Sequence, residues 1–361
     1  MIRALSPYYR TIPLTYGAGT TCEYFKLHIK VWTGSINSVP AEATYTIVYE
    51  NTEQSTGDHT INVAPLLRDF VEFTPGTNGS AFTILDGGDN QQWVKTYVEY
   101  DGGTTAFEEE EDLFVAGYTY GNEGENFLGR GPDDSNYPDI MLPLYDHTAY
   151  RGGCFVVPIS IENVTTFNQV IVRSYPDNQI FEAQNIGSSI QSDQQVQYIW
   201  IDVSDATTDD YITVSWKGEL LTIIIKDEYR FDPMEVHFIN KMGAQQSFTF
   251  FKEQKSSLKV TDNVFESNIG QPSSGSHQFL RYNVQARTSI TASTGFITES
   301  ENETIKQLML SERVWMRTID DDVFVPLNIT TTNAKFKTRQ KDRLINYDIT
   351  FDVAYNEINN V

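Results

Sequence analysis

The chain has 361 residues, 40% of them apolar and 13% aromatic, which is enough to build more than one hydrophobic core. It carries 49 acidic residues against 26 basic ones, for a formal net charge of −23. Because phosphate contacts need Lys and Arg, this balance argues against specific nucleic-acid binding and against anionic membrane surfaces. Abundant Tyr and Phe, with Val and Thr in alternating runs, predict an all-β, multidomain protein built of β-sandwiches.

The first 120 residues divide into an extended arm, residues 1–20, and a β-sandwich over residues 21–120. The run CEYFKLHIKVW alternates apolar and polar positions, and ATYTIVYE, HTINV and QWVKTYVEY follow between turn signals. Pro65 can open one short helical turn in VAPLLRDFVEF. We expect the arm either to pair with a neighbouring subunit or to be disordered.

Residues 101–150 break this pattern and are rich in Gly, Asn and acidic side chains, so they predict a long loop, with residues 121–152 as the linker between domains. A second β-domain is expected over residues 153–233. Its predicted strands are CFVVPIS, QVIVRSY, QIFEAQN, QVQYIWIDV, DYITVSW and ELLTIIIKD, the last two joined by a tight turn at residues 216–218.

The third β-domain, residues 234–361, contains the one strong helix signal of the chain. Ser300 and Glu303 have capping-box spacing, and Ile305, Leu308 and Met309 follow the i, i+3, i+4 pattern, which predicts a helix over residues 301–312 with one buried face. Strands are predicted over residues 234–240, 247–252, 279–291, 313–318, 323–330 and 345–355. Residues 262–278 read as a polar loop.

No catalytic, cofactor or metal motif is present in the sequence. None of the five histidines stands near another His or a Cys at metal-ligand spacing, and the two cysteines, Cys22 and Cys154, lie far apart, which predicts buried free thiols. The five Trp residues fall at strand positions and are expected in cores. Residues 1–14 lack a continuous apolar segment, so we expect synthesis in the cytoplasm.

A cluster of basic residues near the C-terminus contrasts with the acidity of the rest of the chain. It consists of Lys335, Lys337, Arg339, Lys341 and Arg343. The acidic counterparts are Glu108, Glu109, Glu110, Glu111 and Asp112, with Glu299, Glu301 and Glu303 as a second group. Such a contrast predicts either a solvated loop or a contact between copies of the chain, with one patch meeting a different patch of its neighbour.

Three segments of the C-terminal third are EVHFINKMGAQQSFTFFK, IKQLMLSERVWM and VPLNITTTNAKFKTRQKDRLINYDITFDVAYNEINNV. With these segments, the C-terminal third resembles structural proteins of tailed-bacteriophage virions. The resemblance implies a tail-tube-like β-domain with one helix and a place in the tail, baseplate or neck of the virion. It also implies a ring of copies in contact with other virion proteins. The net charge of the chain adds a hypothesis of its own, that an acidic lumen of such a ring would let DNA pass without binding it.

Two other functions remain open at this stage. A receptor-binding or adhesin protein with carbohydrate-contacting β-domains predicts exposed aromatic side chains at loop tips, such as Tyr118, Tyr120 and Tyr137. A glycan-active enzyme would need two carboxylates facing each other across a cleft, and no such pair stands out among 49 acidic residues.

Overall fold

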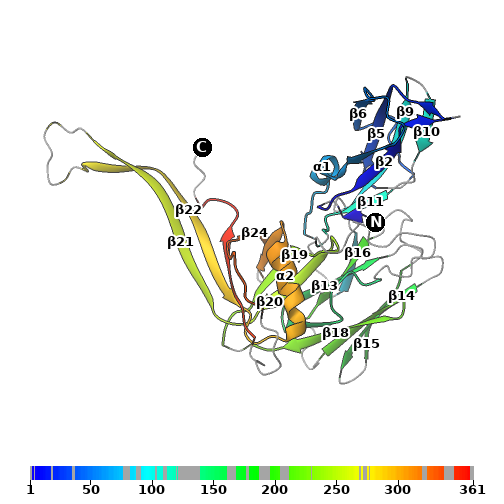
Figure 1. Ribbon diagram of the computed structural model, residues 1–361. Helices are drawn as coiled ribbons and strands as arrows, with labels where there is room; N and C mark the ends of the chain where they lie inside the picture. The colour runs from blue at the N-terminus through cyan, green and yellow to red at the C-terminus, as the bar shows by residue number, and fades with distance from the viewer. Residues whose placement is uncertain are drawn as a thin grey trace.

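The computed structural model shows an all-β protein with one longer α-helix near its C-terminal end (Figure 1). It describes residues 2–3, 5–17, 19–34, 37–75, 82–86, 91–101, 104–108, 112–118, 120, 139–160, 168–175, 179–186, 196–203, 211–228, 230–267, 270, 275, 277–318, 323–336 and 345–357.

The N-terminal part is a six-stranded sheet with two small strand pairs against it. In spatial order the main sheet runs β1 (Ile2–Arg3), β11 (Asp112–Val115), β9 (Gln91–Tyr100), β5 (Tyr24–Trp32) and β6 (Tyr45–Glu50), with β10 (Thr104–Glu108) also on β9. The small pairs are β2 (Tyr9–Pro13) with β7 (Asp58–Asn62) and β3 (Thr15–Tyr16) with β4 (Thr20–Thr21). The core between them includes Tyr8, Ile12, Phe25 and Tyr100, so the predicted arm packs within its own chain.

The middle part is a β-sandwich. Its larger sheet runs β12 (Asp146–Tyr150), β18 (Glu219–Lys226), β17 (Tyr211–Trp216), β14 (Asn168–Tyr175) and β15 (Gln179–Ile186). Its smaller sheet runs β13 (Cys154–Ser160), β16 (Val196–Asp202) and β8 (Phe82–Asp86). Phe155, Val157 and Ile159 of β13 face the sandwich core, while Cys154 and Val156 face a second core. Strand β13 is apolar from Cys154 to Ile159 because both of its faces are buried.

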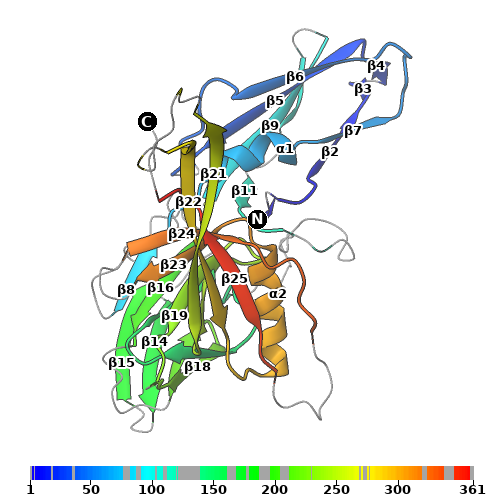
Figure 2. The same cartoon turned by 90° about the vertical axis from the view of Figure 1, so that its left-hand side faces the viewer.

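The C-terminal part is a seven-stranded sheet with helix α2 (Asn302–Leu310) on one face (Figures 1 and 2). Its strand order is β20 (Gln245–Phe250), β19 (Met234–Ile239), β23 (Val314–Thr318), β24 (Val323–Ile329), β25 (Asp348–Val353), β22 (Phe279–Ser293) and β21 (Gln254–Glu266). Ile305 and Leu308 of the helix enter the core of this sheet, as their spacing predicts. Trp315 and Ile239 belong instead to the second core, which joins the three parts.

The start of the helix differs from the prediction. Thr298, not Ser300, forms the capping box, and Glu301 accepts hydrogen bonds from the Thr298 backbone at 2.8 Å and from its hydroxyl at 3.1 Å. A 3₁₀ turn, Glu299–Glu301, then leads into α2. Both Thr298-x-x-Glu301 and Ser300-x-x-Glu303 satisfy the sequence pattern, and the extended backbone at Thr298 selects the first.

Several strands lie where loops were predicted. Strand β21 takes in residues 262–266 of the expected polar loop, and β10, β11 and β12 lie in the expected loop over residues 101–150. Pairing also crosses the predicted domain boundaries, because β8 joins β16 and β12 joins β18 in parallel. Between residues 64 and 70 the expected helical turn is present as α1 (Ala64–Leu67) and a following 3₁₀ turn, with Pro65 at its start. None of the helices among the described residues is long and apolar enough to cross a membrane.

Candidate functional site

The most prominent feature of the molecule is the hairpin of β21 and β22, which extends well beyond its sheet (Figure 1). Only Ser289–Ser293 of β22 pairs with β25, so the part from Phe279 to Thr288 pairs with β21 alone. Ten residues of strand span about 30 Å. We call the two strands β21 and β22 together the hairpin arm, and the part of β22 that pairs with β25 is its base.

Apolar side chains lie exposed along the hairpin arm. All 13 residues of β21 are exposed to solvent. The large exposed apolar side chains of the arm are Leu258, Val260, Val264, Phe265, Phe279, Leu280 and Tyr282. Alternation along β21 places Leu258, Val260 and Val264 on one face, whereas Phe265 packs edge-to-face against Tyr282 on the other. Exposed apolar side chains gathered on one element are typical of a protein–protein contact.

The outer edge of the arm offers backbone hydrogen-bonding groups. Among the described residues, β21 is the last strand of its sheet and pairs with β22 only. A long exposed edge strand is a template for pairing with another chain. The two strands of the arm carry four basic and two acidic side chains, in a chain that is otherwise strongly acidic. The edge therefore suits a partner with an acidic surface and a free strand edge.

Contacts at its base hold the arm in a fixed direction. Lys259 donates to both carboxylate oxygens of Asp352 on β25, at 2.7 and 2.9 Å. Burial opposes ionisation of Asp352, but hydrogen bonds from Lys259 and Ser289 lower the pKa of its carboxyl group. Past β25, the Glu357 backbone N–H donates to the Ala286 carbonyl at 2.8 Å. The segment after β25 therefore contacts β22 and helps to fix the direction of the arm.

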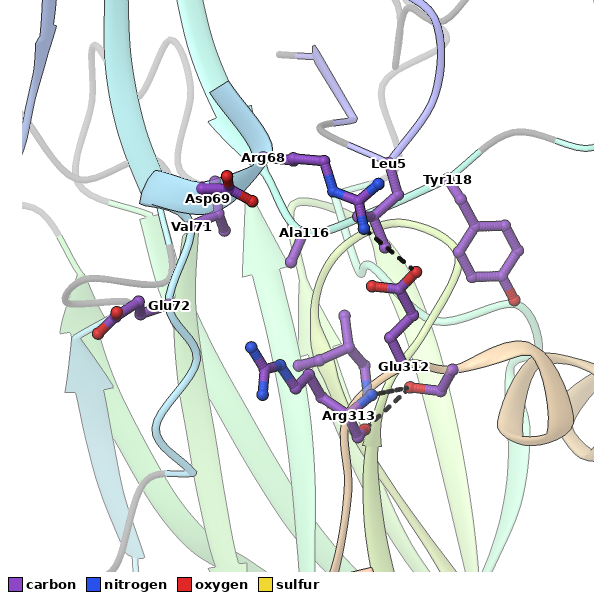
Figure 3. Close-up of a pocket in the computed structure, with 11 residues that line it drawn as sticks. Leu5, Arg68, Asp69, Val71, Glu72, Ala116, Tyr118, Glu312 and Arg313 are labelled. Carbon is purple, nitrogen blue, oxygen red and sulfur yellow. Dashed lines mark hydrogen bonds and ion pairs between the residues drawn. The ribbon is translucent and has the colours of Figure 1, made fainter. Parts of the chain in front are cut away.

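A pocket of about 170 Å³ lies between the N-terminal part and the loop after α2 (Figure 3). Arg68 reaches across it to Glu312 at 3.7 Å, and Arg313 lies on the same side as Glu312. No histidine or cysteine lines the pocket, and the Ser311 hydroxyl donates to the Arg313 carbonyl at 2.9 Å. Its acidic groups are the carboxylates of Asp69, Glu72 and Glu312.

Most of the predicted contact charges cannot be placed. Lys335 is exposed, as a contact residue should be. Lys337, Arg339, Lys341 and Arg343 lie outside the described residues, as do Glu109, Glu110 and Glu111; for Glu108 and Asp112 only the backbone, in β10 and β11, is described. Their contact role stays a prediction.

Two of the three residues of the second acidic group are bound within the chain, whereas Glu299 is exposed. Glu301 is buried in the capping box, and Glu303 accepts a hydrogen bond from the Tyr120 hydroxyl at 2.6 Å and one from Gln307 at 3.0 Å. Lys306 also lies over the Tyr120 ring, with its ammonium group 3.5 Å from the ring centre. Glu301 and Glu303 therefore do not present free charges for a contact between copies.

Two aromatic residues named for glycan contact are not exposed at loop tips. Tyr118 and Tyr120 are half-buried against α2, and that expectation for them is wrong. Tyr137 lies outside the described residues. The tryptophans are buried as predicted, at strands or beside them, and both cysteines are buried free thiols.

The structure brings together one polar cluster that the sequence hides. Cys154 on β13 and Glu235 and His237 on β19 meet at the second core, with exposed fractions of 3%, 2% and 0%. Glu235 Oε1 lies 2.7 Å from Cys154 Sγ and 2.5 Å from His237 Nε2. Burial opposes ionisation of Glu235, but the hydrogen bond from His237 and the charge of Arg317 lower the pKa of its carboxyl group. We call these three residues the buried triad.

Sequence reasoning missed both features for identifiable reasons. Cys154 and Glu235 are 81 positions apart, so no spacing rule connects them. Strand β21 lacks a buried face, so its polar and apolar residues follow no burial pattern that would distinguish it from a loop.

Comparison with protein-family models and with curated protein sequences finds no match to this chain.

Proposed function

We propose that this protein is a non-enzymatic structural component of a phage tail, baseplate or head–tail junction, and that it assembles into a ring. The observation that carries the proposal is the hairpin arm, a two-stranded extension with exposed apolar side chains and a free strand edge. Building such an arm exposes apolar surface to water, at a cost of about 25 cal/mol per Å². Assembly recovers that cost.

The partner of the arm in this proposal is a second copy of the same chain. The arm is basic while the rest of the chain is acidic, so arm and body are complementary in charge. A contact between an arm and a different surface of the next copy is heterologous, and repetition of that contact closes a ring when the rotation allows. Other virion proteins would bind above and below the ring.

The remaining charge of the chain fits passage of DNA through such a ring. A net charge of −23 places acidic groups over much of the surface, and an acidic lumen repels phosphate instead of binding it. This part of the proposal requires that the lumen of the assembled ring be acidic. An electron-microscopy reconstruction with a neutral or basic lumen would remove it.

The receptor-binding alternative has less support from the described residues. Tyr118 and Tyr120, two of its three named contact residues, are held by α2 instead of standing free. The pocket beside α2 is lined by charged side chains and holds one Tyr, without the exposed aromatic platform that sugar binding commonly uses.

The first experiment measures the mass of the purified protein in solution and images the same sample by electron microscopy. The proposal expects closed rings, or a concentration-dependent equilibrium between single chains and rings. A stable monomer or trimer that binds cell-surface glycans would contradict it and support the receptor-binding function.

A further inference from the structure

We propose that the buried triad of Cys154, Glu235 and His237 is a zinc site. The site is independent of the assembly role. Thiolate sulfur, imidazole nitrogen and carboxylate oxygen are the donor types that Zn²⁺ takes in proteins. One such atom from each of the three residues lies within 4.8 Å of the others, and all three residues are buried.

The two carboxylate oxygens of Glu235 contact different groups. Oε2 accepts a hydrogen bond from the Cys154 backbone N–H at 3.0 Å and lies 3.3 Å from Arg317 Nη1. Oε1 faces both the sulfur and the imidazole nitrogen. The carboxylate is thus held through one oxygen while the other points at the two remaining donors, which is how an ordered single-oxygen ligand is oriented.

Gly153 makes this placement of the carboxylate possible. A Cβ atom at position 153 would lie 2.9 Å from Glu235 Oε2, closer than such atoms approach. The chain turns at Gly153 and immediately presents Cys154 at the start of β13. Because Gly153 has no side chain, the Glu235 carboxylate oxygen can approach the backbone directly before Cys154.

The donors lie closer together than they would around a bound ion. A sulfur–oxygen separation of 2.7 Å equals that of an ordinary O–H···O bond, although sulfur is the larger atom. A tetrahedral zinc with bonds of about 2.3 Å to sulfur and about 2.0 Å to nitrogen and oxygen would set the donors about 3.3–3.5 Å apart. The sulfur–oxygen and nitrogen–oxygen pairs, now at 2.7 and 2.5 Å, would each open by less than about 1 Å to admit the ion.

A metal-bound imidazole usually forms a hydrogen bond through its second ring nitrogen, and His237 has a neighbour for that bond. Gln245 Nε2 lies 2.9 Å from His237 Nδ1. With Nε2 bound to zinc, the ring proton sits on Nδ1, and a half-turn of the Gln245 amide presents its Oε1 to that proton. Binding also displaces the Cys154 thiol proton, so thiolate and carboxylate together balance the two charges of the ion.

Such a site would fasten two sheets. Cys154 belongs to the three-stranded sheet of the sandwich, whereas Glu235 and His237 belong to the seven-stranded sheet. Zinc bound here would therefore stabilise the packing of the middle and C-terminal parts against each other, since a metal that binds only the folded state adds its binding free energy to stability. The fourth position would be filled by water.

The test compares the full-length chain with three alanine variants, all produced with zinc and freed of loose metal by gel filtration. Cys154→Ala removes a ligand, and Cys22→Ala is the matched control, because Cys22 is an equally buried free thiol outside the triad. We expect about one zinc per chain in the wild type and in Cys22→Ala, and less than about a tenth of that in Cys154→Ala. Gln245→Ala should bind zinc about 10- to 100-fold more weakly.

A second readout covers the case in which Cys154→Ala does not fold. Wild-type protein refolded with Co²⁺ should show the near-ultraviolet absorption of a cobalt–thiolate bond and a higher Tm than protein refolded with a chelator. Absence of zinc from the wild type together with no cobalt–thiolate absorption would overturn the proposal. Equal zinc content in folded Cys154→Ala and Cys22→Ala would also overturn it.

Discussion

The hairpin arm and two members of the buried triad, Glu235 and His237, belong to the same seven-stranded sheet, yet their side chains have opposite surroundings. In the arm, apolar groups such as Leu258 and Phe279 are more than half exposed, at 58% and 61%. In the triad, ionisable groups are removed from water and bonded to one another. The arm therefore exposes apolar side chains, which folds normally bury. Strand β19, near the opposite edge of the sheet, buries ionisable side chains, which folds normally expose.

This difference separates residues that stabilise the fold from residues that serve contact with another molecule. Changes in the triad should lower stability because they leave buried polar groups without partners. Changes at the exposed positions of the arm should leave stability almost unaltered, because these side chains lie outside the cores, unlike Ile290 and Ala292 at the base of β22. The predictions below run from the largest expected loss of stability to the smallest.

The largest effect is expected for Glu235→Gln. This change removes the charge that Arg317 and His237 share in the interior, and breaking a buried pair of this kind costs about 3–5 kcal/mol. Urea unfolding measures the loss. The matched change in the arm is Asp262→Asn, which breaks the exposed ion pair with Arg281 and should cost less than about 1 kcal/mol. Similar losses for the two variants would contradict the comparison.

A pH effect of similar size is expected from His147 in the middle sandwich. Burial lowers its pKa to about 4 from an ordinary 6.5, so between these values the unfolded chain binds a proton that the folded chain does not. The free energy of unfolding should therefore fall as the pH drops from 6.5 to 4, by about 3 kcal/mol.

Unfolding at a series of pH values, for the wild type and for His147→Gln, checks this effect. The His147→Gln variant should lose most of the decline over that pH range, whereas His277→Gln, an exposed histidine just before β22, should keep it. A decline that is unchanged in His147→Gln would assign the effect to other groups.

A smaller loss is expected at the tight turn between β17 and β18. Lys217 and Gly218 both have positive φ, at 46° and 94°, which is the geometry of a two-residue hairpin turn. Gly218→Ala should cost about 1 kcal/mol through backbone strain alone, because no other group lies near the added methyl. Gly57→Ala, at a glycine without a positive φ, is the control and should be near neutral.

The smallest effect on stability is expected in the arm. The triple variant Leu258→Ser, Val260→Ser and Val264→Ser replaces one apolar face with hydroxyl groups. Each side chain is about half exposed or more, so the free energy of unfolding should change by less than about 0.5 kcal/mol per site. Thermal unfolding compares it with the wild type, and a loss of several kcal/mol would show that the arm packs within its own chain.

The sequence predicts strands well where at least one face is buried, and poorly where burial is absent. CFVVPIS is predicted at the residues observed for β13, because its apolar run is bounded by turn signals. Strand β21 was missed because no buried face gives it a period. The basic cluster and the acidic run were visible from charge, but the arm needed the pairing of β21 with β22 to appear.

The buried triad could not be predicted, because it depends on the packing of one sheet against another. Glu235 and His237 stand two positions apart on β19 and share a face, which alternation alone indicates. Cys154 joins them only after β13 packs beside β19 and β20. The one signal in the sequence is Glu235 itself, which lies within a predicted strand rich in apolar residues. A carboxylate buried in such a strand needs a hydrogen-bonding or charged partner.

The measurement that tests the central claim most directly is the oligomeric state of the triple arm variant beside a matched control. The control carries Val48→Ser, Leu220→Ser and Ile224→Ser, three strand residues of similar exposure outside the arm. Mass measurement and electron microscopy should show rings for the wild type and the control, and single chains for the arm variant. Rings of equal abundance in both variants, or no rings in the wild type, would contradict the account.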